Sequence, residues 1–209
     1  MEPKNVSKRL LLRLPVYLNY LKSLPEHTTD ISATRIAGAL GLGDVMVRKD
    51  LAKVSNGGRR KVGHDRETLI QDIEDFLDIN SIIGTVLVGT GKLGQALLDY
   101  DGFEASGMSI LAGFDINPEK KRTNGKKRIF HVSRLKMFCA SNDVRIGIIA
   151  VPAHQAQGVC DELVACGVRG IWNFAPVHLN VPGNVTVQNE NLAVSLASLR
   201  VQLKETVKH

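Results

Sequence analysis

Aromatic residues and cysteines are both scarce in this sequence. Aromatic residues make up 5% of the 209 residues, and only one of them is a tryptophan, so the stacked rings that bind single-stranded nucleic acid are not expected. The three cysteines, Cys139, Cys160 and Cys166, form no C-x-x-C pair, and the six histidines lack the spacing of metal ligands. We therefore expect neither a disulfide framework nor a metal site, as is usual in a reducing cytoplasm.

Long apolar runs are also absent. No stretch approaches the roughly 18 uninterrupted apolar residues of a membrane span, and residues 1–5 run into charged residues without the apolar segment of a signal peptide. Hydrophobic residues at 44% and charged residues at 23% are typical of a folded globular chain. We expect a folded, cytoplasmic protein with no membrane partner, whose net charge of +6 permits a polyanionic partner.

The N-terminal part of the chain predicts a helix-turn-helix. Apolar residues with mainly helical spacing predict a first helix over residues 8–24, and Ser32 is placed to cap a short second helix over residues 33–40. After a glycine-containing break, Asp44 is expected to cap a third helix that continues to Val54. In this arrangement the last helix enters the major groove of DNA.

Positive charge concentrates in the third helix and in the segment after it. Seven Lys and Arg residues face two Asp residues between positions 48 and 66. Arg48 and Lys49 lie on the predicted recognition helix, and residues 57–63 form a glycine-flanked basic loop suited to a wing along DNA phosphates. The alternative is a solvated helical face followed by a flexible basic loop.

A glycine motif marks the second half as a dinucleotide-binding fold. An apolar, β-branched run at residues 82–88 leads into a G-x-G-x-x-G motif, and a helix follows. The first glycine permits a tight turn, the second lets the backbone approach a pyrophosphate, and the third allows close helix packing. Amides at the helix N-terminus then face the anion. The predicted binding residues are Gly89, Thr90, Gly91, Lys92, Leu93 and Gly94.

An acidic residue completes this motif. A second predicted strand over residues 109–114 ends at Asp115, about 20 residues beyond the glycines, as the fingerprint requires. Its carboxylate can accept hydrogen bonds from the adenosine ribose hydroxyls and repels a 2′-phosphate, which favours NAD(H) over NADP(H). Six cations between residues 120 and 128 would admit NADP(H) if they folded back on the adenosine, and are otherwise solvated surface.

Later segments continue the sheet. Strands are expected over residues 144–152 and 184–188, a helix over residues 154–166, and an apolar segment over residues 170–176. The alternation of strands and helices predicts an α/β fold with a doubly wound, Rossmann-like parallel sheet.

The second half leaves little room for an enzyme. A dehydrogenase needs an acid or base beside the nicotinamide and a pocket for its substrate. His154 is the strongest catalytic candidate, although a histidine at the start of a helix is more often solvated or capping. We expect no catalytic residue; an NAD-dependent oxidoreductase with a regulatory N-terminus is the alternative.

The C-terminal segment predicts an apolar helix. Residues 191–209 carry leucines at helical spacing and further apolar residues on other faces. Such a helix can pack on its own domain or exchange with a second subunit by domain swapping. A homodimer suits DNA, because a two-fold protein contacts two half-sites of a palindrome.

Together these motifs resemble the Rex family of redox-sensing transcriptional repressors. The matching stretches are residues 13–18, 47–51, 58–63, 89–94, 113–118, 150–153, 170–176 and 189–193. The resemblance implies a winged-helix DNA-binding domain over residues 1–80, a Rossmann NAD(H)-binding domain over residues 81–190, and a domain-swapped dimerisation helix over residues 191–209. It also implies a homodimer that binds palindromic double-stranded operator DNA when NADH is low and is released from it by NADH.

The resemblance further implies site residues. DNA contacts are expected from Arg13, Ser32, Met46, Arg48, Lys49, Lys53, Arg59, Arg60 and Lys61. Tyr100, expected to end the glycine-loop helix, corresponds to a tyrosine near the nicotinamide. The rest of the cofactor site is expected from Val151, Pro152, Asn173, Phe174, Ala175 and Pro176.

The chain departs from the family pattern at several positions. Asn19 stands where members often carry an arginine, and Asn191 stands where an acidic residue is common, so an ion pair between these positions cannot form. Met46 replaces a common polar residue, and two aromatic residues common before the wing are absent. Residues 173–176 also resemble the CoA-binding domains of ligases, so a CoA-binding regulator is a further alternative.

Overall fold

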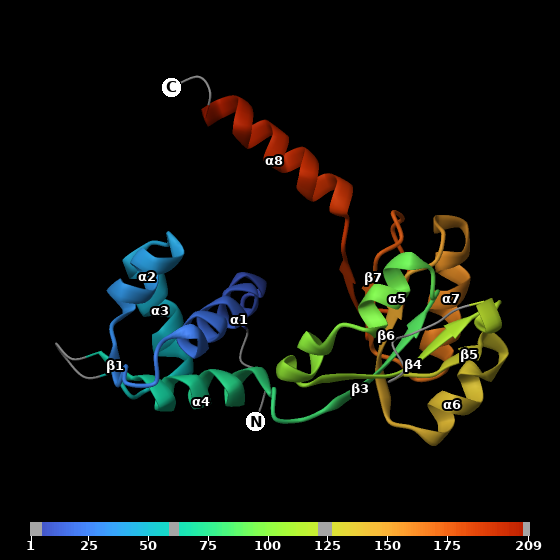
Figure 1. Ribbon diagram of the computed structural model, residues 1–209, viewed down its shortest axis with the longest axis horizontal. Coiled ribbons are helices and arrows are strands. Elements are labelled where there is room, and N and C mark those ends of the chain that lie inside the picture. Colours follow the sequence, from blue (N-terminus) through green and yellow to red (C-terminus); the bar gives the residue numbers. More distant parts are fainter. Residues whose placement is uncertain (1–5, 59–62, 121–126, 207–209) are drawn as a thin grey trace. The chain divides into compact units, whose positions relative to one another are not determined.

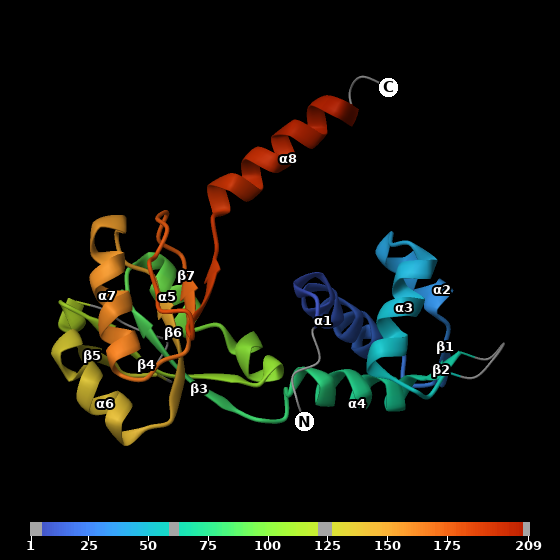
Figure 2. The ribbon, with the colours of Figure 1, turned by 180° about the vertical axis from the view of Figure 1, so that it is seen from behind.

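The chain folds into two compact units, residues 1–81 and 82–209. The computed structural model describes residues 6–58, 63–120 and 127–206, and Figures 1 and 2 show each unit from two sides. The predicted domain boundary near residue 80 lies at the end of the first unit. A separate dimerisation element over residues 191–209 stays a prediction.

The first unit combines helices with a short antiparallel ribbon. In chain order its elements are α1 (Lys8–Ser23), β1 (Asp30–Ile31), α2 (Ala33–Leu40), α3 (Asp44–Val54), β2 (His64–Asp65) and α4 (Arg66–Leu77). The ribbon pairs Ile31 of β1 with His64 of β2. Helices α2 and α3 lie in sequence between the two strands of the ribbon, which is the order of a winged helix-turn-helix.

The first unit has its own hydrophobic core. Side chains at spacings of three, four and seven residues place one apolar face of each helix in it. Its largest member is Tyr17, and other members are Leu10, Leu14, Leu21, Ile36, Val47, Leu51, Leu69 and Ile73. The core therefore fixes which faces of α2 and α3 turn outward.

Local signals explain where the helices begin and end. Ser32 caps α2 by accepting a hydrogen bond from the Arg35 amide at 3.1 Å, as predicted. Gly41 ends α2 with a φ of 65°, a left-handed conformation that glycine adopts readily. The predicted cap of α3 is wrong, because Gly43 occupies the cap position. Asp44 is instead the first helical residue, and its carboxylate accepts a hydrogen bond from Thr34 at 2.8 Å.

The second unit is a parallel sheet with helices on both faces. Its strands are β3 (Ile83–Val88), β4 (Met108–Asp115), β5 (Ile129–His131), β6 (Val144–Ile149), β7 (Gly170–Asn173) and β8 (Thr186–Asn189). They are ordered β5-β4-β3-β6-β7-β8, and every neighbouring pair is parallel. The prediction of a doubly wound parallel sheet is confirmed. The short edge strand β5 was not predicted from the sequence.

Helices α5 (Lys92–Leu98), α6 (Leu135–Ser141) and α7 (Ala153–Ala165) lie between these strands, with the short 3₁₀ segments η1 (Asp101–Ser106), η2 (Pro118–Lys120) and η3 (Val132–Arg134). Helix α8 (Leu192–Thr206) follows the last strand, β8. No helix among the described residues is long and apolar enough to cross a membrane.

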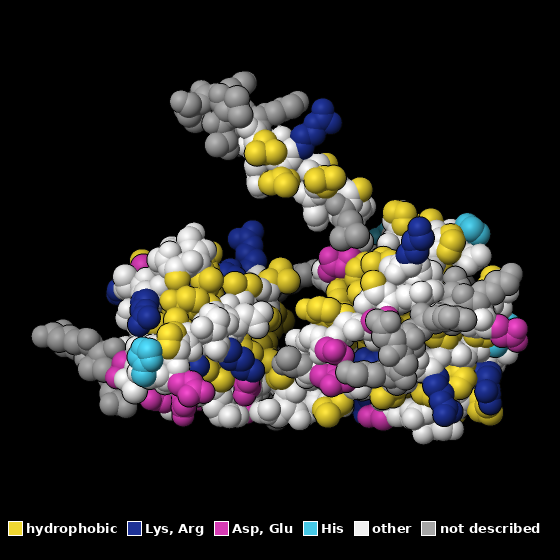
Figure 3. Space-filling model, in the orientation of Figure 1, with side chains coloured by type: hydrophobic (Ala, Val, Ile, Leu, Met, Phe, Trp, Pro, Cys, Tyr) yellow, Lys and Arg dark blue, Asp and Glu magenta, His cyan; other side chains and the backbone are white. Residues whose placement is uncertain are grey.

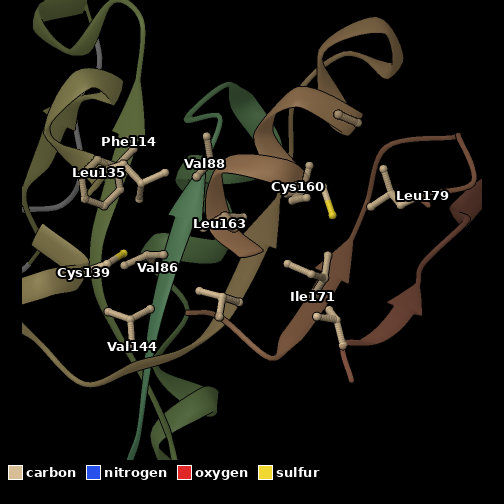
Figure 4. Close-up of a cluster of buried hydrophobic side chains, with 14 of the residues drawn as sticks. Val86, Val88, Phe114, Leu135, Cys139, Val144, Cys160, Leu163, Ile171 and Leu179 are labelled. Atoms are coloured by element: carbon tan, nitrogen blue, oxygen red, sulfur yellow. The ribbon is translucent and has the colours of Figure 1, made fainter. Parts of the chain in front are cut away.

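Alternating side chains of the central strand fill two apolar layers. Val86 and Val88 of β3 point into a cluster with Leu135 of α6 and Leu163 of α7 (Figure 4). Leu87, on the opposite face of the same strand, packs with residues of α5 and η1. A strand buried on both faces explains the uninterrupted apolar run in its sequence.

Candidate functional site

The loop between β3 and α5 has the backbone geometry that its glycines predict. Gly89 has a φ of 95°, a conformation that strains any residue with a side chain. A Cβ at Gly94 would overlap the carbonyl oxygen of Gly89, so a side chain there would push α5 away from the loop. A Cβ at Gly91 would meet no atom within 4 Å. The first and third glycines thus allow close packing, and the space at Gly91 lets a ligand approach the backbone.

A pocket of about 360 Å³ lies at the carboxyl ends of β3, β4 and β6. The chain connections leave β3 and β6 in opposite directions, so the pocket occupies the switch point at which open α/β sheets bind ligands. Five of the residues predicted to bind the cofactor line it, namely Gly89, Gly91, Asp115, Val151 and Pro152. Most of the other lining side chains are apolar, as is usual for a cofactor site.

Asp115 links the end of β4 to the glycine loop. Its Oδ2 accepts hydrogen bonds from the Thr90 amide at 2.8 Å and from the Thr90 hydroxyl at 2.9 Å. Its Oδ1 accepts one from the Asn117 amide at 2.9 Å. Asp115 therefore shapes the loop, and the ribose contact stays a prediction.

The first turn of α5 carries the remaining residues of the motif. Gly91 occupies its cap position, and no side chain caps the helix. Lys92 and Leu93 are exposed at the start of α5. Backbone amides at an uncapped helix start bind anions well, so this turn suits a pyrophosphate.

A second predicted cofactor segment follows β7. Asn173 is fully buried, and its side-chain amide donates to the carbonyl oxygens of Ala175 at 3.1 Å and Val177 at 2.9 Å, and to Oδ1 of Asn189 at 2.9 Å. Its own Oδ1 accepts a hydrogen bond from the Ala175 amide at 3.0 Å. These bonds use the side chain to shape the loop after β7. The pocket described above is not lined by residues 173–176, so their contact with a cofactor stays a prediction.

Four aromatic rings form a chain of contacts at the apolar layer that holds Leu87, α5 and η1. The ring of Tyr100 meets Phe103 edge to face at 4.9 Å between centroids, Phe103 meets Trp172 at 5.6 Å, and Trp172 meets Phe174 at 4.7 Å. Tyr100 is nevertheless 57% exposed. The prediction that it ends α5 is wrong, because that helix ends at Leu98. Its ring is held in place on one side and open to a ligand on the other.

The outer face of α3 carries the predicted recognition residues. Arg48, Lys49 and Lys53 are exposed there, and Met46 is half-buried. The Arg48 guanidinium forms an ion pair with Asp44 one turn earlier, at 2.7 Å. Exposed pairs of this kind contribute at most about 1 kcal/mol, so Arg48 can exchange Asp44 for a phosphate or a base at little cost.

The inner face of α3 carries a buried carboxylate, Asp50. Its oxygens accept hydrogen bonds from Arg13 Nε at 2.7 Å, from Arg13 Nη2 at 2.9 Å and from the Tyr17 hydroxyl at 2.9 Å. Burial alone would raise the pKa of Asp50, but the hydrogen bonds from Arg13 and Tyr17 lower it below its usual value. Burial, together with the bond to Asp50, raises the pKa of Tyr17 to about 12. The cluster is therefore an ionised Asp50 held between two donors of α1.

This cluster bears directly on the prediction that Arg13 contacts DNA. Three contacts tie the ends of Arg13 and Tyr17 to α3, and the Arg13 side chain is only 23% exposed. The structure thus gives Arg13 a partner within its own unit. A direct phosphate contact from Arg13 stays a prediction that competes with this arrangement.

The expected basic surface is smaller than the sequence indicates. Arg66 is buried, and its guanidinium donates to the carbonyl oxygen of Leu21 at 2.9 Å, at the end of α1. Including Arg66 in an exposed basic surface is therefore wrong. Ser32 is exposed at the start of α2. Arg59, Arg60 and Lys61 lie outside the described residues.

Comparison with known proteins covers both units. Residues 5–52 match a family model described as a putative DNA-binding protein N-terminus, and residues 80–177 match one described as a CoA binding domain. The redox-sensing transcriptional repressor Rex of Porphyromonas gingivalis is 39% identical over 201 residues, covering 95% of this chain and 92% of the relative. The Rex repressor of Clostridium perfringens is 37% identical, covering 94% and 93%. The chain belongs to the Rex family.

Solved Rex-family structures share the fold. RSP in complex with beta-NAD+ and operator DNA aligns with a TM-score of 0.88 at 32% identity, covering 97% of this chain and 94% of the other. RSP in complex with beta-NADH aligns with a TM-score of 0.86 at 32% identity, covering 97% and 96%. The predicted Rex-like architecture is confirmed, whereas the domain swap of α8 stays a prediction.

Asn19 and Asn191 stand where the family resemblance predicts a charged pair. Asn191 accepts a hydrogen bond from the Val194 amide at 3.1 Å and so caps α8. Asn19 is exposed on α1. Asn191 therefore has a local role in ending the segment before α8, and its neutral side chain performs that role as an aspartate would.

Sequence reasoning missed the partners of several functional residues. The bond between Thr90 and Asp115 joins residues 25 positions apart, which no local pattern reveals. Asp50 did leave a signal, because it interrupts the apolar face that Val47 and Leu51 form on α3. A charge at an inward position predicts a buried partner, although it does not identify Arg13.

Metal ligands and a catalytic histidine are the groups that could support another function. Among residues 6–58, 63–120 and 127–206, no group of three or more His, Cys, Asp or Glu residues could hold a metal ion. His154 is exposed in the first turn of α7. The structure therefore adds no support for a catalytic role of this histidine.

Proposed function

We propose that the chain is a redox-sensing repressor of transcription, which binds palindromic operator DNA when NADH is low and releases it when NADH accumulates. One observation carries this proposal: a Rex-family chain joins a helix with outward cations, α3, to a switch-point pocket bounded by Asp115. RSP, at 32% identity, has been crystallised with beta-NAD+ and operator DNA and with beta-NADH. Those complexes support both NAD(H) and operator DNA as ligands of this chain.

NAD(H) fits the pocket on the chain's own geometry. The open space at Gly91 admits a pyrophosphate to the backbone, and Asp115 stands at the end of β4 where a ribose is held in this fold. Val151 and Pro152 supply apolar contacts at the end of β6. We assign binding of NAD(H) to these residues and to Thr90, Lys92, Leu93 and Gly94, and a contact near the nicotinamide to Tyr100 and the segment Asn173–Pro176.

The switch requires a difference between the two redox forms. Bound nicotinamide carries a positive charge when oxidised and is neutral when reduced. Only contacts that differ between these forms can shift the two units between DNA-binding and released arrangements. To shift the ratio of these two arrangements from 1:99 to 99:1, the ligand must bind one arrangement about 5.5 kcal/mol more tightly than the other. In a dimer, two cofactor sites share this free energy.

The apolar surface of α8 supports a homodimer. Val194, Leu196, Leu199, Val201 and Leu203 are each at least half exposed. Figure 3 shows hydrophobic side chains on the visible face of this helix. A helix with uncovered apolar residues on several faces gains stability by packing against another surface. We propose that α8 packs in a second copy of the chain and that the dimer contacts two half-sites of an operator in the cytoplasm.

Two other functions remain as outcomes of the test. The relatives are named as transcriptional repressors, which supports a non-catalytic protein over an NAD-dependent oxidoreductase. The match of residues 80–177 to a CoA binding domain model favours CoA as a second candidate ligand. The pocket favours NAD(H), because Asp115 repels a phosphate placed on the adenosine ribose, which CoA carries.

The test is the effect of each nucleotide on DNA affinity. A duplex is selected by the wild-type protein from a random-sequence pool, and its dissociation constant is measured by fluorescence anisotropy at one salt concentration with NADH, NAD+ or CoA. NADH should weaken binding about 5- to 150-fold, the usual range of coupling between sites, and NAD+ much less. Equal effects of NADH and NAD+ would contradict redox sensing, and a response to CoA alone would favour the CoA-binding regulator.

A further inference from the structure

Helix α3 turns a carboxylate toward the interior of the first unit. Asp50 is 4% exposed and lies on the inner face of α3 with Val47 and Leu51. An apolar residue of similar size would pack there without the cost of removing a charge from water. The chain instead holds an aspartate that accepts three hydrogen bonds in the middle of the helix that carries its candidate DNA contacts.

The bonds to Asp50 are directional, whereas its apolar neighbours are not. Val47 and Leu51 stabilise α3 by burial, which tolerates small rotations of the helix. Arg13 forms a two-pronged bond to both carboxylate oxygens at 2.7 and 2.9 Å, and Tyr17 adds a third bond at 2.9 Å. A planar fork of this kind fixes both position and orientation.

Rotation of α3 matters for the residues on its outer face. Successive residues of a helix are about 100° apart, so Arg48 and Lys49 lie on the outer side of the helix when Asp50 faces inward. A rotation of α3 would redirect both cations together. Base-specific contacts depend on the directions of these two side chains, whereas contacts to phosphate tolerate a change of direction better.

We propose that Asp50, Arg13 and Tyr17 are positioning residues for DNA recognition, which set the rotation of α3 and so the directions of Arg48 and Lys49. Arg13 then acts through Asp50, not by contact with a phosphate. This inference rests on the proposed function, because it takes operator DNA as the ligand.

The decisive variant replaces the ion pair by apolar residues. In Arg13→Met/Asp50→Leu the volume is roughly kept and no charge is left unpaired, and replacement of a buried ion pair by apolar residues is often neutral or stabilising for the fold. The buried Tyr17 hydroxyl loses its acceptor in this variant, which offsets part of that gain. The full-length variant is compared with wild type on the selected duplex and on a shuffled duplex of the same composition. Thermal unfolding by circular dichroism measures the stability of both proteins.

A matched control removes another ion pair of the same unit. Lys22 of α1 and Glu74 of α4 form a pair at 2.6 Å that does not involve α3. The variant Lys22→Met/Glu74→Leu should keep the wild-type preference for the selected duplex. Lys49→Ala is the control for a direct contact, and it should lower the slope of log affinity against log salt by about 0.9 if Lys49 meets one phosphate.

We expect the Arg13→Met/Asp50→Leu variant to remain folded and to keep the wild-type slope of log affinity against log salt. Its preference for the selected duplex should fall about 10- to 100-fold, which is the effect of losing one bidentate contact to a base. An unchanged preference in a folded variant would overturn the positioning role. A slope reduced by about 0.9 would also overturn it, because Arg13 would then be a phosphate contact.

Milder variants keep the proposal testable if the double variant does not fold. Arg13→Lys retains the charge but not the fork, and Tyr17→Phe removes one bond. Both should lower the preference without changing the salt slope, Arg13→Lys more than Tyr17→Phe, and an unchanged preference in both would overturn the proposal. A wild-type protein that selects no duplex would contradict the proposed function instead.

Discussion

The two units position their candidate ligands in different ways. In the second unit the pocket is shaped by backbone, because Gly89 and Gly94 set how closely strand, loop and helix approach and Gly91 leaves the loop open. In the first unit the orientation of α3 depends on side chains, since Asp50 of α3 is bound by Arg13 of α1. A backbone-built site tolerates almost no added atom, whereas a side-chain network responds to charge and pH.

The largest expected effect comes from breaking the backbone side of this comparison. Gly94→Ala places a Cβ against the carbonyl oxygen of Gly89, and overpacking of this kind costs about 1–3 kcal/mol or more. We expect a lower stability of the second unit and a loss of NADH binding of about 10- to 100-fold, since each 1.4 kcal/mol is about a factor of ten. Denaturant unfolding followed by Trp172 fluorescence, together with calorimetric titration of NADH, measures both.

Gly91→Ala is the matched control for this prediction. Its Cβ meets no atom within 4 Å, so stability should be unchanged while NADH binding is still weakened by the occupied approach. Equal stability of the two variants would show that the close approach of α5 to the loop does not matter. Full NADH affinity in Gly91→Ala would show that the pyrophosphate lies elsewhere.

The same contrast explains how far the sequence could predict the molecule. Glycine spacing and the apolar run before it specify backbone, so the parallel sheet, the glycine loop and the place of Asp115 followed from local patterns. Partners distant in sequence did not, because Asp50 binds a residue 37 positions away and Arg66 binds a carbonyl oxygen 45 positions away. Edge strand β5 is three residues long, too short for a periodic signal.

The side-chain network of the first unit should make its stability sensitive to alkaline pH. The pKa of Tyr17 is raised from 10.0 to about 12, so its neutral form is favoured in the folded state. The stabilisation is complete below about pH 10 and is lost as pH rises toward 12. Two pKa units correspond to about 3 kcal/mol.

Tyr17→Phe provides the comparison for this alkaline effect. The variant should lack the decline in unfolding free energy between about pH 10 and 12 that the wild type shows, and tyrosinate absorbance should lose its latest-titrating component. Parallel pH profiles of wild type and Tyr17→Phe would show that Tyr17 is not held by Asp50.

The lowered pKa of Asp50 makes stability sensitive to acid pH. The stabilisation by ionised Asp50 is present above the pKa of the unfolded state and is lost as pH falls through the lower pKa of the folded state. Asp50→Asn should lack this decline in unfolding free energy.

The smallest expected effect comes from a side chain in the backbone-built site. Asp115→Asn keeps the shape of the residue but removes its charge and replaces one acceptor with a donor, which weakens its bonds from Thr90. We expect NADH to bind about 10-fold more weakly, since a hydrogen bond to a charged group contributes about 1.5–3 kcal/mol and part of it is retained.

Preference for NADH over NADPH should fall by more, because the repulsion of a 2′-phosphate is lost. Thr90→Val removes the hydroxyl bond to Asp115 but leaves the charge of Asp115 in place. Titration of both nucleotides into Asp115→Asn and into Thr90→Val therefore separates the two roles of Asp115. An unchanged preference in Asp115→Asn would assign the choice between NADH and NADPH to other residues and leave Asp115 with the loop alone.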